Sequence, residues 1–288
     1  MRYYCTREGG KQRLIARDDS NAYDVTATRP SVTTFGDLAH VADVASETID
    51  EVTNRLIDEA EPHPIPDETT VDIPLLVDEV WAAGVTYEIS EQAREDESGM
   101  PEIYLDVYEA DRPEIFFKST RSRVVAPGDS VGIRGDSEWN VPEPELGVVL
   151  HNGDTVGYTI GNDMSSRSIE GANPLYLPQA KVYDRSCSLG PCIVTPDTID
   201  DPHNLEMQMQ ISRDDELLYE DTTSTSEMVR TCEELVTSLT DHNTIPETTV
   251  LLTGTSLVPE DNFTLEPDDR IDIDMEGIGR LSNTVTTV

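Results

Sequence analysis

The stretch of sequence that decides the fold runs from residue 142 to 168 and reads PEPELGVVLHNGDTVGYTIGNDMSSRS. Its apolar runs, 147–150 and 155–160, lie on either side of Asn152-Gly153. Asn-Gly between two alternating apolar segments is the strongest short-range signal for a two-residue β-hairpin turn. The stretch therefore predicts a β-hairpin, and the other signals in the chain are placed relative to it.

Acidic side chains mark the two ends of this predicted hairpin. Glu143 and Glu145 are two residues apart, so on an extended strand both side chains point the same way. Pro142 and Pro144 cannot donate ladder hydrogen bonds, which predicts an edge strand or an irregular extended segment. Asp163 follows the returning strand, which brings it back toward the glutamate pair. Three carboxylates can thus converge on one ion.

Composition weakens the acidic signal and strengthens a basic one. With 58 Asp and Glu in 288 residues, roughly ten acid-x-acid pairs are expected by chance, so Glu143 and Glu145 prove little alone. Lysine is scarce, since the chain holds only Lys11, Lys118 and Lys181. Lys181 lies in the run QAKVYDRSCSLGP, which follows the hairpin closely. We therefore expect Lys181 to join the carboxylates in one site.

These residue types point to one kind of chemistry. A ligand set made only of carboxylates favours magnesium, or else manganese or calcium, over zinc or copper. A 2-oxo acid suits such a site, because its carboxylate and keto oxygens can chelate the ion, which then acidifies the adjacent carbon. Lys181 would act as a charge clamp on the substrate or, if burial lowers its pKa, as the general base.

The overall charge excludes several partners. A net charge of −38 and an isoelectric point near 4.1 would repel nucleic acid and anionic membranes. The same charge is typical of a cytoplasm with molar salt, where a carboxylate surface stays hydrated. The chain has no apolar run long enough for a membrane span, and its first residues lack a signal-peptide core. Its four cysteines show no CxxC spacing, which predicts reduced buried thiols.

Two parts are predicted along the chain, a small α/β domain with its linker at 1–74 and a β-rich domain at 75–288. In the first part, strands are expected at 2–5 and 12–16, then an amphipathic helix at 35–59 capped by Thr33 or Thr34. The proline-rich segment 61–74 reads as the linker. The fold class is therefore α+β.

In the second part, β signals dominate. Besides the hairpin, strands are expected at 77–87, 114–117, 205–211 and 217–219, with a final strand at 270–275. A helix is expected at 227–240, with Ser226 as its N-cap.

Several motifs, taken in order, resemble the fumarylacetoacetate hydrolase superfamily. They are PEPELGVVL, GYTIGNDMSSRS, QAKVYD, SLGPCIV and LLTGTSLVP, and the resemblance covers about residues 75–288. It implies a catalytic domain with a mixed β-roll fold. It also implies site residues, with Glu143, Glu145 and Asp163 as metal ligands, Lys181 at the substrate, and Thr255 beside Gly254 as a substrate-binding pair.

One departure from the superfamily bears on the reaction. Its hydrolases carry a G-x-N-Y-x-x-H segment whose histidine, with a nearby glutamate, activates water. Here residues 84–90 read GVTYEIS, so Tyr87 matches but Ser90 stands at the histidine position. A serine without a partner base cannot activate water in this way, which argues against C–C bond hydrolysis.

A branch of the superfamily fits better, the archaeal 2-keto-3-deoxy-pentonate dehydratases. The runs VWAAGVTYEIS, VYEADRPEIFFKST, GDSEWNVPEPELGVVL and ANPLYLPQAKVYD resemble that branch. The resemblance implies a hydro-lyase that converts 2-dehydro-3-deoxy-D-arabinonate, which is also 2-keto-3-deoxy-D-xylonate, to 2,5-dioxopentanoate in oxidative pentose degradation. It implies magnesium as the metal and a homo-oligomer as the assembly.

The remaining site residues have alternative roles. Glu114 and Lys181 are the candidate bases at C3 of the substrate, while Tyr87, Lys118 and Thr255 are expected to bind it. Glu114 and Lys118 could instead form a simple ion pair on a strand face, and Arg167 is expected to brace the loop of Asp163. An acylpyruvate or fumarylpyruvate hydrolase and a non-catalytic keto-acid binder remain the alternative functions.

Overall fold

The hairpin predicted at the centre of the sequence is the centre of the fold. The computed structural model describes residues 1–87, 107, 110–260 and 262–288. Strand β9 (Pro144–His151) pairs with β10 (Asp154–Asp163) in an antiparallel ladder. Asn152 and Gly153 between them have φ values of 52° and 92°, the left-handed pair that such a turn requires. The prediction of a hairpin is confirmed.

From Gly147 onward β9 is an interior strand that pairs on both sides, whereas the edge or irregular extended segment predicted at residues 142–145 has, among the described residues, only β10 beside it as a ladder partner. Its second partner is β15 (Thr248–Leu252), which runs antiparallel to residues Gly147 to His151. Since β15 ends at Leu252, its ladder does not reach Pro144, and the missing proline N–H costs no bond there. The glutamate pair thus lies where a central strand projects past one of its neighbours.

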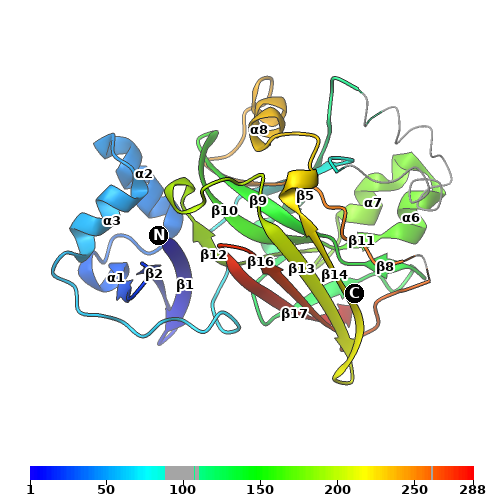
Figure 1. Ribbon diagram of the computed structural model, residues 1–288, viewed down its shortest axis with the longest axis horizontal. Helices are drawn as coiled ribbons and strands as arrows, with labels where there is room; N and C mark the ends of the chain where they lie inside the picture. The colour runs from blue at the N-terminus through cyan, green and yellow to red at the C-terminus, as the bar shows by residue number, and fades with distance from the viewer. Residues whose placement is uncertain (88–106, 108–109, 261) are drawn as a thin grey trace.

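A large mixed sheet surrounds the hairpin and makes up the middle of the molecule (Figure 1). Within the described residues its path runs β3-β2-β1-β12-β10-β9-β15-β4-β5, with β6 added beside β12. The strands not yet given are β1 (Arg2–Glu8), β2 (Lys11–Arg17), β3 (Ala22–Asp24), β4 (Glu79–Gly84), β5 (Glu114–Thr120), β6 (Val124–Val125) and β12 (Cys187–Val194). The strands predicted at 2–5, 12–16 and 114–117 are confirmed, each somewhat longer than expected.

A second sheet packs on one face of the first. Its order is β14-β13-β16-β17-β7, with strands β7 (Ser130–Ile133), β13 (Glu206–Arg213), β14 (Glu216–Ser224), β16 (Arg270–Met275) and β17 (Gly279–Thr287). Alternate residues of the two sheets form one apolar core, including Leu146, Val148, Leu150, Met207, Met209, Ile211, Ile271 and Ile273. The strand at 270–275 is therefore confirmed but is not the last, since β17 follows it. A short pair, β8 (Asn140–Val141) with β11 (Ser165–Ser166), lies beside the site.

The N-terminal helices, drawn in blue in Figure 1, pack with the large sheet in a second apolar cluster that includes Val149, Leu189 and Val250. The single helix predicted at 35–59 is wrong, since α2 (Phe35–Ala45) and α3 (Ile49–Ile57) are separate. Ser46 ends α2 in the left-handed conformation, and Thr48 starts α3 through a capping box with Glu51. Thr34 caps α2 as predicted. A short helix, α1 (Val25–Thr28), precedes them.

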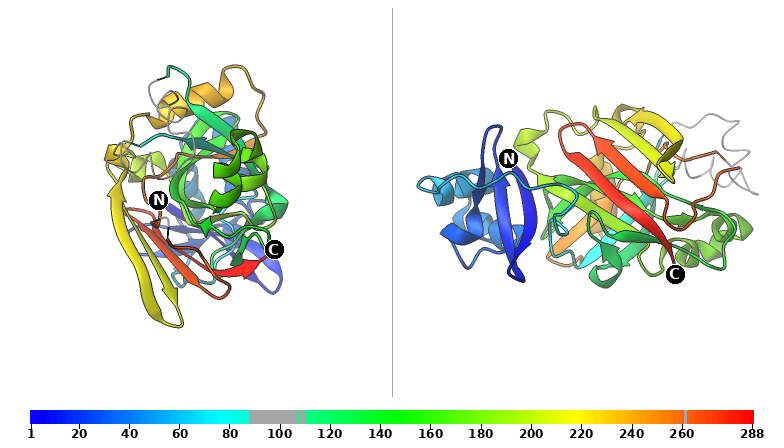
Figure 2. Two further views of the ribbon diagram at one scale, coloured as in Figure 1. Left: turned by 90° about the vertical axis from the view of Figure 1, so that its right-hand side faces the viewer. Right: turned by 90° about the horizontal axis from the view of Figure 1, so that it is seen from below.

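The N-terminal part lies at one end of the molecule, as Figure 1 and the right-hand view of Figure 2 show. It joins the large sheet through β1, whose Arg2 and Tyr3 pair with Val194 and Ile193 of β12. The segment 61–74 forms neither helix nor strand, as expected for a linker. The division of the chain at residue 74 stays a prediction.

The described residues contain three further α-helices, α6 (Arg167–Ala172), α7 (Leu177–Lys181) and α8 (Cys232–Thr240). The helix predicted at 227–240 begins later than expected, because Thr231 rather than Ser226 caps it through a capping box with Glu234. Residues Thr225–Glu227 form a 3₁₀ turn instead.

All four cysteines are buried and free, as predicted. No helix in the described part of the chain has the length and apolarity needed to cross a membrane.

Candidate active site

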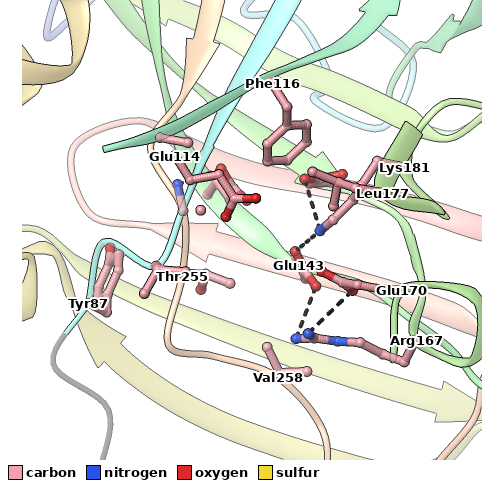
Figure 3. A pocket seen from close by; sticks show the side chains of 16 residues that line it. Tyr87, Glu114, Phe116, Glu143, Arg167, Glu170, Leu177, Lys181, Thr255 and Val258 are labelled. Atoms are coloured by element: carbon pink, nitrogen blue, oxygen red, sulfur yellow. Dashed lines mark hydrogen bonds and ion pairs between the residues drawn. The ribbon is translucent and has the colours of Figure 1, made fainter. Parts of the chain in front are cut away.

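A cavity opens where the ends of β4, β5, β9 and β10 meet helices α6 and α7 (Figure 3). Its described lining is Ala83, Gly84, Val85, Tyr87, Glu114, Phe116, Glu143, Glu145, Asp163, Arg167, Glu170, Leu177, Lys181, Gly254, Thr255 and Val258. Most of the residues that sequence analysis assigned to the site therefore share one cavity wall. Lys118 does not lie on the wall, and Ser90 lies outside the described residues.

The three predicted metal ligands converge. Glu143 precedes β9, Glu145 is the second residue of that strand, and Asp163 ends β10. One carboxylate oxygen from each lies within 4.8 Å of the others, and all three residues are buried. The hairpin register explains the convergence, because Gly161 pairs with Glu145 and the N–H of Asp163 donates to the carbonyl of Glu143 at 2.8 Å.

Lys181 enters the same cluster from the last turn of α7. Its Nζ lies 2.6 Å from Glu143 Oε2, 3.3 Å from Asp163 Oδ2 and 2.7 Å from Ser165 Oγ. Three acceptors thus surround an ammonium group that has three donors to offer. Burial acts to lower the pKa of Lys181, but the carboxylates of Asp163 and Glu143 outweigh it and raise that pKa well above its usual value. The lowered pKa considered from the sequence is not what this environment produces.

Sequence analysis missed a second ion-pair layer behind Glu143. Arg167 at the start of α6 places Nη2 3.1 Å from Glu143 Oε1 and Nη1 3.5 Å from Glu170 Oε2. Arg167 therefore braces Glu143, and its predicted bracing of the Asp163 loop stays a prediction. Its spacing of three residues from Glu170 was the available signal, since such pairs meet on a helix surface.

Glu145 is held by the backbone instead of by a cation. The N–H of Gly254 donates to Glu145 Oε2 at 2.6 Å. Gly254 has a φ of +83°, and a Cβ atom there would lie 2.2 Å from Thr86 Oγ1, so only glycine allows this close approach. Gly254 thus holds a candidate metal ligand in place, and the substrate contact expected for it stays a prediction.

The cluster separates the pKa values of its carboxyl groups. Burial acts to raise the pKa of Glu143, but Lys181 and Arg167 lower it to about 2. For Glu145, burial together with the negative charges of Asp163 and Glu143 raises the pKa well above its ordinary value. Glu145 is therefore the ligand that most lacks a neighbouring positive charge.

The substrate-facing residues lie across the cavity from the cations. In Figure 3, the carboxylate of Glu114 and the side chain of Lys181 both point into the cavity. Burial raises the pKa of Glu114, and the charge of Lys181 only partly opposes this. The Tyr87 hydroxyl is buried and has no hydrogen-bond partner among the described residues. The Thr255 hydroxyl accepts from the N–H of Leu257 at 3.0 Å, which leaves its proton free to be donated.

The structure corrects the role expected for Lys118. Its side chain is completely buried behind Asp163, with which it forms an ion pair, and it donates to the carbonyl of Met164 at 2.9 Å and to that of Lys181. Among the described residues, its ion pair is with Asp163 and not with Glu114, and its side chain does not line the cavity. Lys118 is therefore placed to position Asp163 and the end of α7, and it does not belong to the described lining of the cavity.

The donor set fits a divalent ion that prefers oxygen. Among the described residues, the carboxylates of Glu114, Glu143, Glu145, Asp163 and Glu170 face the cations Lys118, Arg167 and Lys181. Five negative groups and three positive groups leave a formal excess of two negative charges, which one divalent cation would neutralise. Buried charges need such compensation. Magnesium bound here would contact Glu143, Glu145 and Asp163.

Similar proteins share this architecture. A protein of Haloferax volcanii named probable 2-keto-3-deoxyxylonate dehydratase is 59% identical, with all of both chains covered. A protein of Saccharolobus solfataricus named 2-dehydro-3-deoxy-D-arabinonate dehydratase is 43% identical over 72% of this chain and 71% of its own length. A solved structure titled 2-keto-3-deoxy-D-arabinonate dehydratase complexed with magnesium and 2,5-dioxopentanoate superimposes with a TM-score of 0.85 at 32% identity, covering 100% of this chain and 99% of its own.

The same relationship appears at the level of the family. Residues 79–286 match the family described as fumarylacetoacetate (FAA) hydrolase C-terminal, and this segment contains every residue of the cavity wall. The hairpin with its three converging carboxylates lies in the middle of the matched segment. The chain therefore belongs to the fumarylacetoacetate hydrolase family.

Proposed function

We propose that this protein is a magnesium-dependent hydro-lyase that converts 2-dehydro-3-deoxy-D-arabinonate to 2,5-dioxopentanoate in oxidative pentose degradation. One observation carries the proposal: three buried carboxylates and Lys181 share a cavity whose described lining contains no histidine. Such a site can hold a 2-oxo acid but offers no imidazole to activate water for hydrolysis. The relative that is 59% identical over its whole length bears the name of a dehydratase for the same class of sugar acid.

In this proposal, the positive charge of Lys181 helps to bind the substrate, and Glu114 removes a proton from C3 of the substrate. Lys181 is already an ammonium bound by three acceptors, so it has no lone pair with which to take a proton. Within the described part of the chain Glu114 forms no ion pair, and its carboxylate points into the cavity (Figure 3). A bound magnesium ion would supply the Lewis acid that acidifies C3 of the 2-oxo acid.

The reaction can then proceed with the groups on the cavity wall. Glu114 removes a proton from C3 and returns it to the C4 hydroxyl, which leaves as water while a double bond forms between C3 and C4. Transfer of a proton from C5 to C3 gives an enol, which becomes the C5 aldehyde. Tyr87 and Thr255 are placed to donate hydrogen bonds to substrate oxygens, because both hydroxyls line the cavity and have a proton free.

The assay of the proposal is direct. The purified protein with magnesium in molar potassium chloride should convert the sugar acid to 2,5-dioxopentanoate, a chelator should abolish turnover, and added magnesium should restore it. Glu145→Gln tests the metal site, because it keeps the shape of the side chain and removes the charge of one proposed ligand. The variant should need a higher magnesium concentration for turnover. Absence of the dioxo acid under these conditions would overturn the proposal.

The same assay separates the alternatives. Pyruvate released from a fumarylpyruvate-type substrate would identify an acylpyruvate hydrolase instead. Tight binding of keto acids without any turnover would identify a non-catalytic binder. The C4 configuration that the enzyme accepts depends on the shape of the cavity, so both pentonate epimers belong in the assay.

The role of Glu114 predicts a pH effect. Burial raises the pKa of this carboxyl group above its ordinary value near 4.5, with Lys181 opposing and Glu170, Glu143 and Asp163 adding to the shift. Since the base must be deprotonated, kcat/KM should rise with pH through this raised pKa. Glu114→Gln should lower kcat/KM by about 10²- to 10⁴-fold, the usual contribution of a general base, and should remove this acidic limb.

The outcome of that measurement decides the assignment of the base. A Glu114→Gln enzyme that kept both its rate and its acidic limb would exclude Glu114. Unchanged magnesium affinity in the variant would show that the loss lies in proton transfer and not in metal binding.

We also propose that the protein works as a homo-oligomer in a high-salt cytoplasm. The net charge of −38 supports the salt proposal, because screening at molar salt limits the self-repulsion of such a chain. Activity and sedimentation measured from low salt to molar potassium chloride test both parts together. Loss of activity on moving to molar salt, or a monomer under those conditions, would contradict them.

A further inference from the structure

A second cluster of metal-ligating side chains lies at the far end of β9 from the active site. His151 is the last residue of β9, His40 lies on α2, and Glu247 immediately precedes β15. One potential ligand atom from each lies within 4.8 Å of the others. Two of the five histidines of the chain thus meet at one point, where helix α2 covers the sheet.

The distances in this cluster are too long for hydrogen bonds and suit an ion. His151 Nε2 lies 3.5 Å from Asp43 Oδ2 and 3.8 Å from Glu247 Oε1, and His40 Nδ1 lies 3.8 Å from the same oxygen of Glu247. A charged hydrogen bond would be about 2.7–2.9 Å long. A tetrahedral zinc ion with bonds of about 2.0–2.1 Å places neighbouring ligand atoms about 3.3–3.4 Å apart, close to the observed spacing.

His151 is the observation that points to a ligand. Its side chain is only 2% exposed, and neither ring nitrogen has a hydrogen-bond partner among the residues that the structure describes. Buried polar atoms in folded proteins nearly always have partners, so an unsatisfied imidazole needs an explanation. Its Nε2 is the atom that approaches both Asp43 and Glu247, which directs the ring into the cluster.

The backbone around the cluster holds these ligands in place. The N–H of Asn152 donates to the carbonyl of Glu247 at 2.9 Å, and its side-chain amide donates to Asp43 Oδ2 at 3.2 Å. Thr248 pairs with His151 in the ladder between β15 and β9. Glu247 and His151 are therefore positioned by the sheet and its turn, and helix α2 supplies His40 and Asp43.

We propose that His40, His151 and Glu247 bind a divalent transition-metal ion of the zinc class, with Asp43 or water as the fourth ligand. Imidazole nitrogens suit zinc, whereas the active-site triad offers only oxygen and suits magnesium. The ion would join α2 to the β9–β10 hairpin, so that it ties the N-terminal part of the chain to the sheet that carries the active site. Its role is structural.

Zinc alone is the probe that tests this site. Protein freed of transition metals and kept in excess magnesium, which is added to compete for the triad, should bind one equivalent of zinc and unfold at a higher temperature when zinc is present. Cobalt in place of zinc should give the visible spectrum of a tetrahedral site. His40→Ala should weaken zinc binding at least about 100-fold, because loss of even an outer-shell partner costs 10- to 100-fold.

The variants keep the proposal falsifiable. His40 is exposed, so its replacement should leave the fold and the magnesium-dependent turnover unchanged. His242→Ala, at another exposed histidine outside the cluster, is the matched control and should bind zinc as the wild type does. Absence of zinc binding in the wild type, or equal affinity in the His40 and His242 variants, would overturn the proposal.

Discussion

Lys181→Met should lower kcat/KM for the 2-keto-3-deoxy sugar acid by about 10²- to 10³-fold, the usual effect of removing one preorganised charge donor. The ammonium lies 2.6 Å from Glu143 and 3.3 Å from Asp163 and lines the cavity, and methionine keeps the length of the side chain without its charge. Steady-state kinetics at saturating magnesium measure the effect. Magnesium affinity should not fall, because the variant removes a positive charge that competes for the same carboxylates.

The chain provides a matched control for this variant. Lys11 is exposed on β2, and Lys11→Met should leave kcat/KM unchanged. A Lys181→Met enzyme with the wild-type rate would show that the lysine only balances charge in the absence of metal.

Lys118→Met should instead act on stability, with a loss of about 3–5 kcal/mol in the free energy of unfolding, as when one partner of a buried ion pair is removed. Lys118 is completely buried and bonds Asp163 together with the carbonyls of Met164 and Lys181. Its removal leaves a buried carboxylate and two carbonyls without their donor. Denaturant unfolding at constant molar salt measures the loss.

The two buried lysines are expected to differ in their effect on activity. Both touch Asp163, but only Lys181 faces the cavity. At a temperature where Lys118→Met is still folded, its kcat/KM should fall less than that of Lys181→Met. Unfolding of Lys118→Met at the wild-type denaturant concentration would contradict the supporting role assigned to Lys118.

Local signals predicted the hairpin well because its instructions lie within the segment itself. Asn152-Gly153 specifies the turn, and alternating apolar residues specify the strands. The local sequence also contains a signal for the break between α2 and α3, since Thr48 and Glu51 have the spacing of a capping box. The apolar periodicity that continues across Ser46 masked this signal. At α8, Thr231 and Glu234 likewise form a capping box that marks the start of the helix.

Long-range contacts account for what the sequence could not predict. The interior position of β9 depends on β15, which lies about a hundred residues further along the chain, and no local pattern announces that pairing. The bond from Gly254 to Glu145 spans 109 positions, and the burial of Lys118 depends on α7 folding over it. The ligand triad was predictable because a single hairpin carries all three members.

Strand β9 also fixes a length that spectroscopy can use. Glu145 lies near its first residue and His151 at its last, so one continuous strand runs from the carboxylate triad to the histidine cluster. Six steps of about 3.3 Å each place the two positions roughly 20 Å apart. With manganese at the triad and copper at the histidines, the protein would carry two paramagnetic centres, one at each end of the same β-strand. Their dipolar coupling would report whether the strand keeps its length when substrate arrives.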